Sequence, residues 1–145
     1  MFADFLTRLL APAPETLADA DARLALSALM VRLARADGAY APEERARITA
    51  VLAERYGLDT TQAEALRAEA EALEAEAPDT VRFTRAIKDA VPYEARAAVI
   101  EALWQVALAD GTRDAHEDTL MRLVASLLGF TDQQSARARQ KVARG

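Results

Sequence analysis

The chain has no cysteine and a single histidine, His116, among its 145 residues. The lack of cysteine excludes disulfides, thiolate metal sites and cysteine nucleophiles. A single histidine excludes most zinc sites and most mechanisms in which histidine is the general base. The chain also has only five glycines and 6% aromatic residues, whereas alanine makes up about a quarter of it. This composition predicts an all-α protein.

Basic charge and long hydrophobic runs are lacking as well. The net charge of −5 argues against nucleic-acid binding, which needs a basic surface. No apolar run approaches the length of a membrane span, and the segment 1–11 lacks the basic start of a signal peptide. No nucleophile–base pair or glycine-rich phosphate loop occurs. We therefore expect one cytoplasmic domain, 1–145, that does not bind nucleic acid and is not an enzyme; membrane contact is not indicated.

Helical periodicity recurs along the chain and predicts a compact bundle of seven or eight helices. Proline, glycine and capping residues give the boundaries. Two capping boxes are predicted, one in Asp59-Thr60-Thr61, with Glu64 three residues after Thr61, and one from Thr131 with Gln134. The expected helices cover about 2–10, Glu15 or Leu17 to Ala36, Pro42 to Gly57, the stretch from the signature Asp59-Thr60-Thr61 to about Glu76, Asp79 or Thr80 to Val91, Pro92 to about 109, Asp114 to Gly129, and a polar last helix from Thr131.

Two charged helices stand out within this pattern. The first is acidic, and we expect its carboxylates to face solvent, as most such runs do: Glu64, Glu69, Glu71, Glu74 and Glu76. The last helix is basic, with Arg137, Lys141 and Arg144 on one side. Such a helix is suited to docking on an acidic partner or an anionic lipid surface. It is equally suited to pairing with the acidic helix of the same chain. Trp104 lies among apolar residues at helical spacing, which predicts core packing.

The most informative feature is an internal repeat. The pattern A-D-G-x5-E occurs once with Asp37 and Glu44 and again with Asp110 and Glu117, and apolar runs flank both copies. Apolar positions before and after the motif match as well, so that the halves cover about 24–58 and 97–130. A repeat of this length predicts two related helical hairpins, each with an acidic pair at its turn.

The repeated acids have a structural and a functional interpretation. In the structural one, each Asp ends a helix and each Glu caps the next one. In the functional one, all four carboxylates continue apolar stripes toward the inner edges of their hairpins. Asp37 and Asp110 also stand at helix C-termini, where a carboxylate needs a nearby cation. That cation is either an arginine or a divalent ion such as Ca²⁺, Mg²⁺ or Mn²⁺. The local arginine candidates are Arg35, Arg45, Arg47 and Arg113.

The spacing D-G-x5-E matches the second half of an EF-hand loop. The first and third loop positions would then be Leu33 and Arg35 in one copy, and Val106 and Leu108 in the other. Both copies thus lack two oxygen ligands that the EF-hand requires. The motif is not an EF-hand, and any metal site needs ligands from both halves.

The segments "ARADGAYAPEERARI" and "ALADGTRDAHEDTL" resemble the TerB family of tellurite-resistance proteins, which is related to the N-terminal domain of DjlA-type membrane co-chaperones. The resemblance covers roughly residues 17–129. It implies a compact α-helical fold of two related halves, a link to tellurite and other chemical stress, and acidic residues proposed to bind metal. By position these are Asp37, Glu44, Asp110 and Glu117. The acidic Glu43 has His116 as its counterpart, so the halves differ.

Two functions follow from these observations. The first is a non-catalytic TerB-like stress protein that binds Ca²⁺, Mg²⁺ or Mn²⁺ through those four carboxylates and acts through protein partners. The second is a metal-free helical interaction module whose acidic turns are structural caps. The absence of a His-Pro-Asp signature argues against a co-chaperone role in cis. The sequence leaves the oligomeric state and the identity of the partners open.

Overall fold

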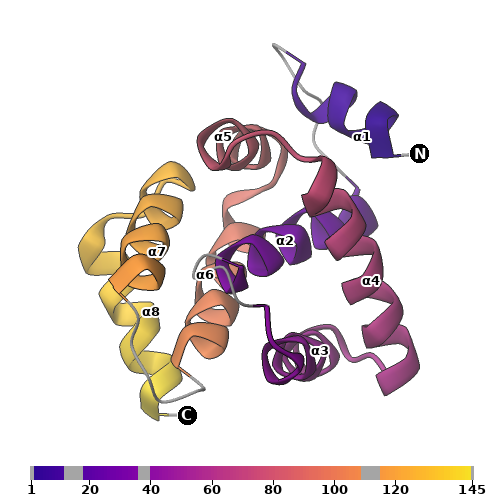
Figure 1. Ribbon diagram of the computed structural model, residues 1–145. Coiled ribbons are helices and arrows are strands. Elements are labelled where there is room, and N and C mark those ends of the chain that lie inside the picture. The colour runs from indigo at the N-terminus through magenta and orange to yellow at the C-terminus, as the bar shows by residue number, and fades with distance from the viewer. Residues whose placement is uncertain (1, 12–17, 36–39, 109–114, 145) are drawn as a thin grey trace.

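The computed structural model describes residues 2–11, 18–35, 40–108 and 115–144, with the side chains of Phe2 and of residues 115–118 outside that description. This part of the chain forms eight helices and no strand, which confirms the all-α prediction (Figure 1). None of these helices is both long enough and apolar enough to cross a membrane. The helices are α1 (Phe2–Leu9), α2 (Asp19–Ala34), α3 (Pro42–Tyr56), α4 (Thr60–Glu76), α5 (Thr80–Ala90), α6 (Tyr93–Leu108), α7 (Ala115–Leu127) and α8 (Asp132–Arg144).

Local sequence signals fix most helix ends. Pro42 is the first residue of α3, and Gly57 ends that helix with a left-handed φ of 63°. The Asp79 side chain accepts a hydrogen bond from the backbone N–H of Arg82 and so caps α5. The described part of α2 begins at Asp19, later than the periodicity predicted.

The predicted signature Asp59-Thr60-Thr61 contains the cap of α4, which is Asp59, but the predicted pairing of Thr61 with Glu64 is wrong. The Asp59 side chain accepts from the backbone N–H of Gln62 at 2.7 Å, and the Gln62 side chain accepts from the backbone N–H of Asp59 at 3.0 Å. Asp59 is extended and Thr60 already helical, so the third helical position is Gln62 and not Glu64. Within the predicted signature, the aspartate is therefore the cap, two residues before Thr61.

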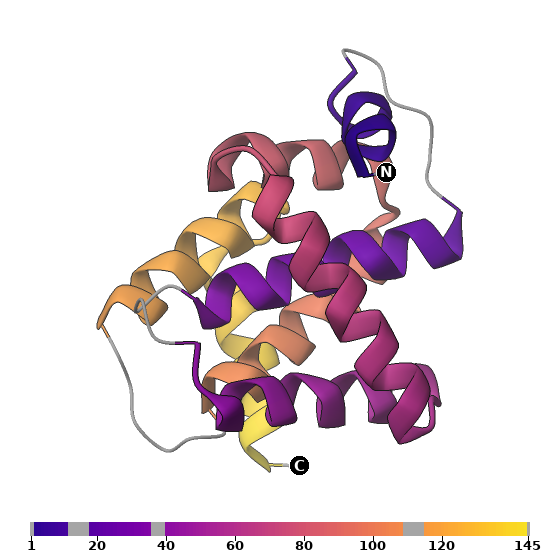
Figure 2. The same ribbon diagram turned by 45° about the vertical axis from the view of Figure 1, so that its right-hand side comes forward.

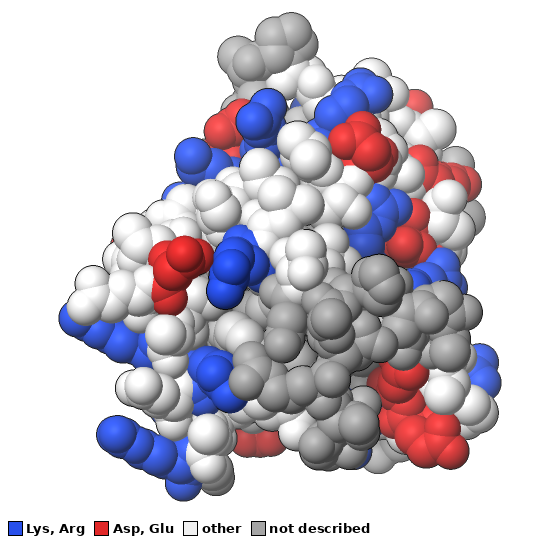
Figure 3. All heavy atoms as spheres, turned by 60° about the vertical axis from the view of Figure 1, so that its left-hand side comes forward, with Lys and Arg blue, Asp and Glu red and all other residues white. Residues whose placement is uncertain are grey.

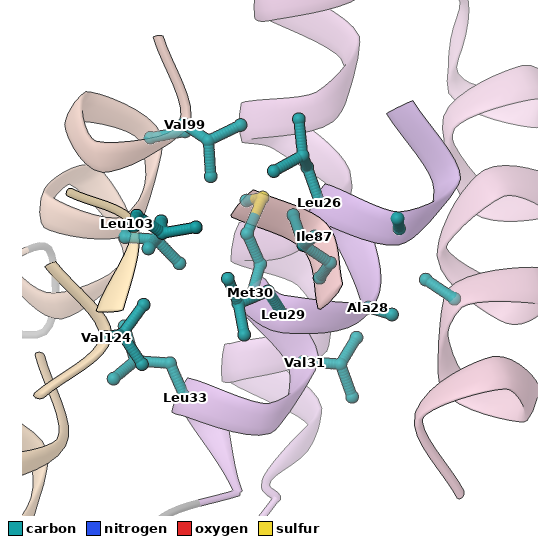
Figure 4. Close-up of a cluster of buried hydrophobic side chains, with 14 of the residues drawn as sticks. Leu26, Ala28, Leu29, Met30, Val31, Leu33, Ile87, Val99, Leu103 and Val124 are labelled. Atoms are coloured by element: carbon teal, nitrogen blue, oxygen red, sulfur yellow. The ribbon is translucent and has the colours of Figure 1, made fainter. Parts of the chain in front are cut away.

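Helix α2 is the centre of the molecule. Eleven of its 16 residues are buried, and it contacts α3, α4, α5, α6 and α7. Figure 4 shows Leu26, Met30 and Leu33 of α2 meeting side chains from α5, α6 and α7. Because α2 is surrounded, its small residues lie on faces that other helices approach closely; Ala25 and Ala28 have no exposed surface. The apolar residues that recur at helical spacing in this segment thus form only one side of α2, which is buried on almost all sides.

The two related hairpins of the sequence are α2–α3 and α6–α7, and each packs against a third helix, α4 or α8. These third helices are themselves equivalent. The capping box of α4, Asp59 with Gln62, recurs 72 residues later as Thr131 with Gln134, whose two hydrogen bonds measure 2.8 and 3.0 Å. The second predicted capping box is thereby confirmed. The repeating unit consists of three helices, α2–α3–α4 and α6–α7–α8, with α5 between them.

A second pair of contacts supports this equivalence. In the first unit, the Arg23 guanidinium lies 4.4 Å from the centre of the Tyr56 ring. In the second unit, Arg96 donates a hydrogen bond to the carbonyl of Leu128. In each unit an arginine from the first helix therefore holds the end of the second helix.

Candidate functional site

The candidate metal ligands are only partly described. Asp37, Asp110 and the side chain of Glu117 lie outside the described residues. Glu44 is half-buried in the first turn of α3. Among the described residues, no group of three or more acidic or histidine side chains comes together. The shared metal site of the four carboxylates thus stays a prediction.

The helices that flank the two motifs are well described. In the sequence, the first motif begins after the end of α2 and ends in α3, and the second begins after the end of α6 and ends in α7. Helix α2 packs against α6 and also contacts α7. In Figure 2, the ends of α2 and α6 and the starts of α3 and α7 all lie on the left-hand side of the molecule. The described helix ends that flank the two motifs therefore lie on the same side of the fold.

The C-terminal end of α2 carries an arginine–glutamate cluster. Glu74 of α4 accepts from Arg32 at 3.2 Å and from Arg35 at 2.6 Å. Arg32 also donates to the carbonyls of Glu74, Ala77 and Pro78. The side chain of Glu74 is only 10% exposed. The prediction that the acidic residues of α4 face solvent is therefore wrong for Glu74, because two arginines of α2 supply the countercharge that its burial requires.

Tyr40 extends this cluster toward α3. Its ring centre lies 5.0 Å from the guanidinium of Arg35 and 5.9 Å from that of Arg45. Burial raises the pKa of the Tyr40 hydroxyl well above its ordinary value, and the neighbouring Glu71 carboxylate adds to this increase. Tyr40 is thus neutral at physiological pH. Two of the arginines proposed as countercharges for the first motif, Arg35 and Arg45, already lie against an aromatic ring, and Arg35 is also bonded to Glu74.

The second unit differs at the equivalent positions. The counterparts of Arg32 and Arg35 are Gln105 and Leu108. Gln105 accepts a hydrogen bond from Arg55 of α3 at 3.0 Å. Among the described residues, the end of α6 thus has no pair of its own arginines like Arg32 and Arg35 of α2. Any site that includes both motifs is electrostatically asymmetric, as the mismatch of Glu43 and His116 already indicated.

Glu101 of α6 is the main acidic partner in the second unit. It lies 3.3 Å from Arg55 and 3.0 Å from Lys141 of α8. Burial alone would raise the pKa of its carboxyl, but hydrogen bonding and attraction from Lys141 and Arg55 outweigh burial and lower the pKa below its ordinary value. The basic last helix, α8, therefore forms its ion pair with α6, through Lys141. The intramolecular partner suggested by the sequence was the acidic helix α4.

Comparison with protein families decides the classification. The family model of the tellurite resistance protein TerB matches residues 23–140. The chain belongs to the TerB family. The match begins in α2 and ends in α8, so the TerB region contains both three-helix units and leaves α1 outside. Comparison with curated proteins and with solved structures gives no match.

Within the TerB region, sequence reasoning missed the Arg32–Glu74–Arg35 cluster. A signal for it was present, because Arg32 interrupts the apolar run Leu29–Leu33. An arginine inside a fully apolar stripe needs an acidic partner when the helix is buried. The sequence did not identify that partner, which lies 42 residues further along the chain.

Proposed function

We propose that this TerB family member is a non-catalytic, stress-associated protein that binds a divalent cation through Asp37, Glu44, Asp110 and Glu117 and acts through protein partners. Ca²⁺, Mg²⁺ and Mn²⁺ are the candidate ions, because the ligands are carboxylates without cysteine and without a histidine cluster.

The observation that supports this proposal is that α2 and α6, the helices that precede the two acidic motifs in the sequence, pack together. Each motif begins where the partial negative charge of a helix C-terminus disfavours a carboxylate. Near the first motif, Arg35 is already bonded to Glu74 at 2.6 Å. A divalent cation would compensate the remaining negative charge of both turns at once.

One observation favours the alternative, a metal-free interaction module with structural acidic turns. The guanidinium groups of Arg35 and Arg45, which precede and follow the first turn in the sequence, lie 5.0 and 5.9 Å from the centre of the Tyr40 ring. Two guanidinium groups close to the first turn would compensate a carboxylate there without any metal. The two functions differ in whether the protein is stabilised by a divalent ion.

Thermal unfolding of the metal-free chain with added Ca²⁺, Mg²⁺, Mn²⁺ or Zn²⁺ distinguishes them. A ligand present at a hundred times its dissociation constant stabilises the folded state by about 2.7 kcal/mol. For a chain of this size, that corresponds to an increase in Tm of about 5–10 °C. Calorimetric titration of the same samples would give the stoichiometry, which we expect to be one ion per chain.

The site assignment is tested with the double variant Asp37→Ala with Asp110→Ala. We expect it to abolish the metal-dependent rise in Tm. The matched control, Glu64→Ala with Glu76→Ala, removes two exposed carboxylates of α4 and should leave the rise unchanged. If no ion raises Tm or produces heat, the metal proposal fails and the interaction module remains. If the double variant still binds metal, the ligand assignment is wrong.

A further inference from the structure

A groove of about 250 Å³ lies between α6 and α8. Its apolar surface comes from Ala97 and Ile100 of α6, Phe130, and Ala138 of α8. Tyr93 stands at one end, 43% exposed, with its ring centre 5.0 Å from that of Phe130. Tyr93 is one of two large apolar residues that are exposed in the described part of the chain. Exposed aromatic residues beside an apolar groove are typical of interaction sites.

The internal repeat shows which side chains such a position accommodates. Under the repeat, Ala97 of α6 corresponds to Leu24 of α2, and Ala138 of α8 corresponds to Leu66 of α4. Leu24 is buried, and Leu66 is half-buried against the core. The first unit therefore has two leucines withdrawn from solvent at the positions where the second unit has two alanines. Leucine-sized side chains fit these positions in the first unit.

The charged side chains that line the groove are two basic residues and one acidic residue, Glu101. The basic residues are Arg137 and Lys141 of α8, and both are exposed. Lys141 is bonded to Glu101, whereas Arg137 makes no ion pair with any described residue. The equivalent positions of α4 are Ala65 and Glu69, so only the second unit has basic side chains at these two positions. Figure 3 shows several Lys and Arg side chains at the lower left of the molecular face that it presents.

The size and shape of the groove indicate the kind of ligand. Pockets for small molecules usually enclose about 300–1,000 Å³ and most of the ligand's surface. This groove is smaller and lies open along a helix pair, so it suits one or two side chains of a larger partner. The apolar walls select a leucine or phenylalanine, and the unpaired guanidinium of Arg137 selects a neighbouring carboxylate.

We propose that the groove between α6 and α8 binds an acidic segment of a partner protein, which places a leucine- or phenylalanine-sized side chain between Ala97 and Ala138 and a carboxylate against Arg137. This inference rests on the proposed action through protein partners, and it is independent of metal binding. Tyr93 covers one side of the inserted side chain, and the Gln134 amide, which donates to the Tyr93 hydroxyl at 3.3 Å, positions the ring.

The test is a titration of the full-length, ¹⁵N-labelled chain with peptides, followed by amide chemical shifts in excess EDTA. The probe is the acetylated and amidated peptide EEDLLDEE. Two control peptides are EEDSSDEE, which lacks the apolar pair, and QQNLLNQQ, which lacks the carboxylates. We expect the probe to shift the amides of α6 and α8 around the groove, and each control peptide to bind at least about fivefold more weakly.

Protein variants then assign the site. Ala97→Leu with Ala138→Leu restores the residues of the first unit, so it should leave Tm unchanged or higher and weaken binding of the probe at least about tenfold. Arg137→Glu should weaken it about fivefold, whereas the matched Arg144→Glu, on the same helix but outside the groove, should change it less than about twofold. If the leucine variant lowers Tm, Ala138→Asp takes its place. This substitution puts a carboxylate at a half-buried position of the groove, and we again expect weaker binding of the probe.

Several results would overturn the proposal. The first is the absence of shifts at millimolar probe, and the second is a set of shifts located away from α6 and α8. Undiminished binding of the probe to the variants at Ala97 and Ala138 would also exclude the groove as its binding site. Equal binding of the neutral peptide would exclude an acidic partner. Because EDTA is present throughout, these results are independent of the metal proposal, and a failure of metal binding leaves the groove proposal unaffected.

Discussion

Replacing Glu74 by alanine should destabilise the fold markedly, although the residue lies in a run of glutamates that resembles a solvated surface. Glu74 is the carboxylate that joins α4 to the end of α2 through Arg32 and Arg35, at 3.2 and 2.6 Å. Removing one member of a buried ion pair usually costs about 3–5 kcal/mol, because the remaining charge is left without a partner.

Two features of the cluster reduce this cost. Arg32 keeps the carbonyl acceptors of Glu74, Ala77 and Pro78, which come from the backbone and survive the substitution. The side chain of Arg35 is 37% exposed, so water can replace part of what it loses. We therefore expect a loss of about 2–3 kcal/mol in the free energy of unfolding and a decrease in Tm of about 5–10 °C.

Urea and thermal unfolding, followed by circular dichroism at the helical band, measure this loss. Glu74→Gln keeps an oxygen acceptor for Arg32 and should lose about half as much. The matched control is Glu76→Ala, an exposed glutamate of the same helix, which should change stability by less than about 0.5 kcal/mol. If Glu74→Ala and Glu76→Ala have equal effects, or if Glu74→Ala costs less than about 1 kcal/mol, the cluster does not stabilise α4 on α2.

Three further predictions concern helix ends and pH. Asp59→Ala removes the cap of α4 and should lower the free energy of unfolding by about 1 kcal/mol, whereas Thr61→Ala should leave it nearly unchanged. If urea unfolding shows the larger loss for Thr61→Ala, the pairing of Thr61 with Glu64 predicted from the sequence is correct after all. Gly129→Ala should cost more than Gly57→Ala, which we expect to cost about 1 kcal/mol. The reason is that a Cβ at Gly129, with φ of 92°, meets Arg96 Nη1 at 3.3 Å, whereas one at Gly57 meets no atom within 4 Å. Finally, the folded chain holds the pKa of Glu101 below its unfolded value near 4.5, so its contribution to stability is present above that pH and disappears as pH falls through the folded pKa. The stability difference between the wild type and Glu101→Gln, measured by urea unfolding from pH 7 to 3, should therefore shrink below about pH 4.5; a constant difference would contradict this assignment.

Most of the secondary structure could be predicted, because its signals are local. Pro42 and Gly57 delimit α3, and Thr131 with Gln134 opens α8, since a proline, a glycine with positive φ and a capping side chain act within one helical turn. The wrong pairing of Thr61 with Glu64 has the same local origin. Two adjacent capping patterns compete in Asp59-Thr60-Thr61, and the aspartate, which lies two residues earlier, starts the helix.

The candidate site could be predicted only as a pattern. The repeat places the acidic pairs of Asp37 with Glu44 and Asp110 with Glu117 at equivalent turns, and the family match to TerB is consistent with that repeat. The sequence could not indicate which arginines near those turns are already engaged. Arg35 pairs with a glutamate 39 residues away, and this pairing depends on how α4 crosses α2.

The sequence by itself thus determined the helices, the duplicated hairpins and the TerB family, because hydrophobic period, capping and motif spacing are properties of short segments. Only the tertiary structure decided that Glu74 is buried, that Lys141 pairs with Glu101, and that Ala97 and Ala138 face a groove. Each of these depends on which helix faces lie together. Burial and countercharge come from residues that are distant in the chain, whereas helical periodicity describes one helix at a time.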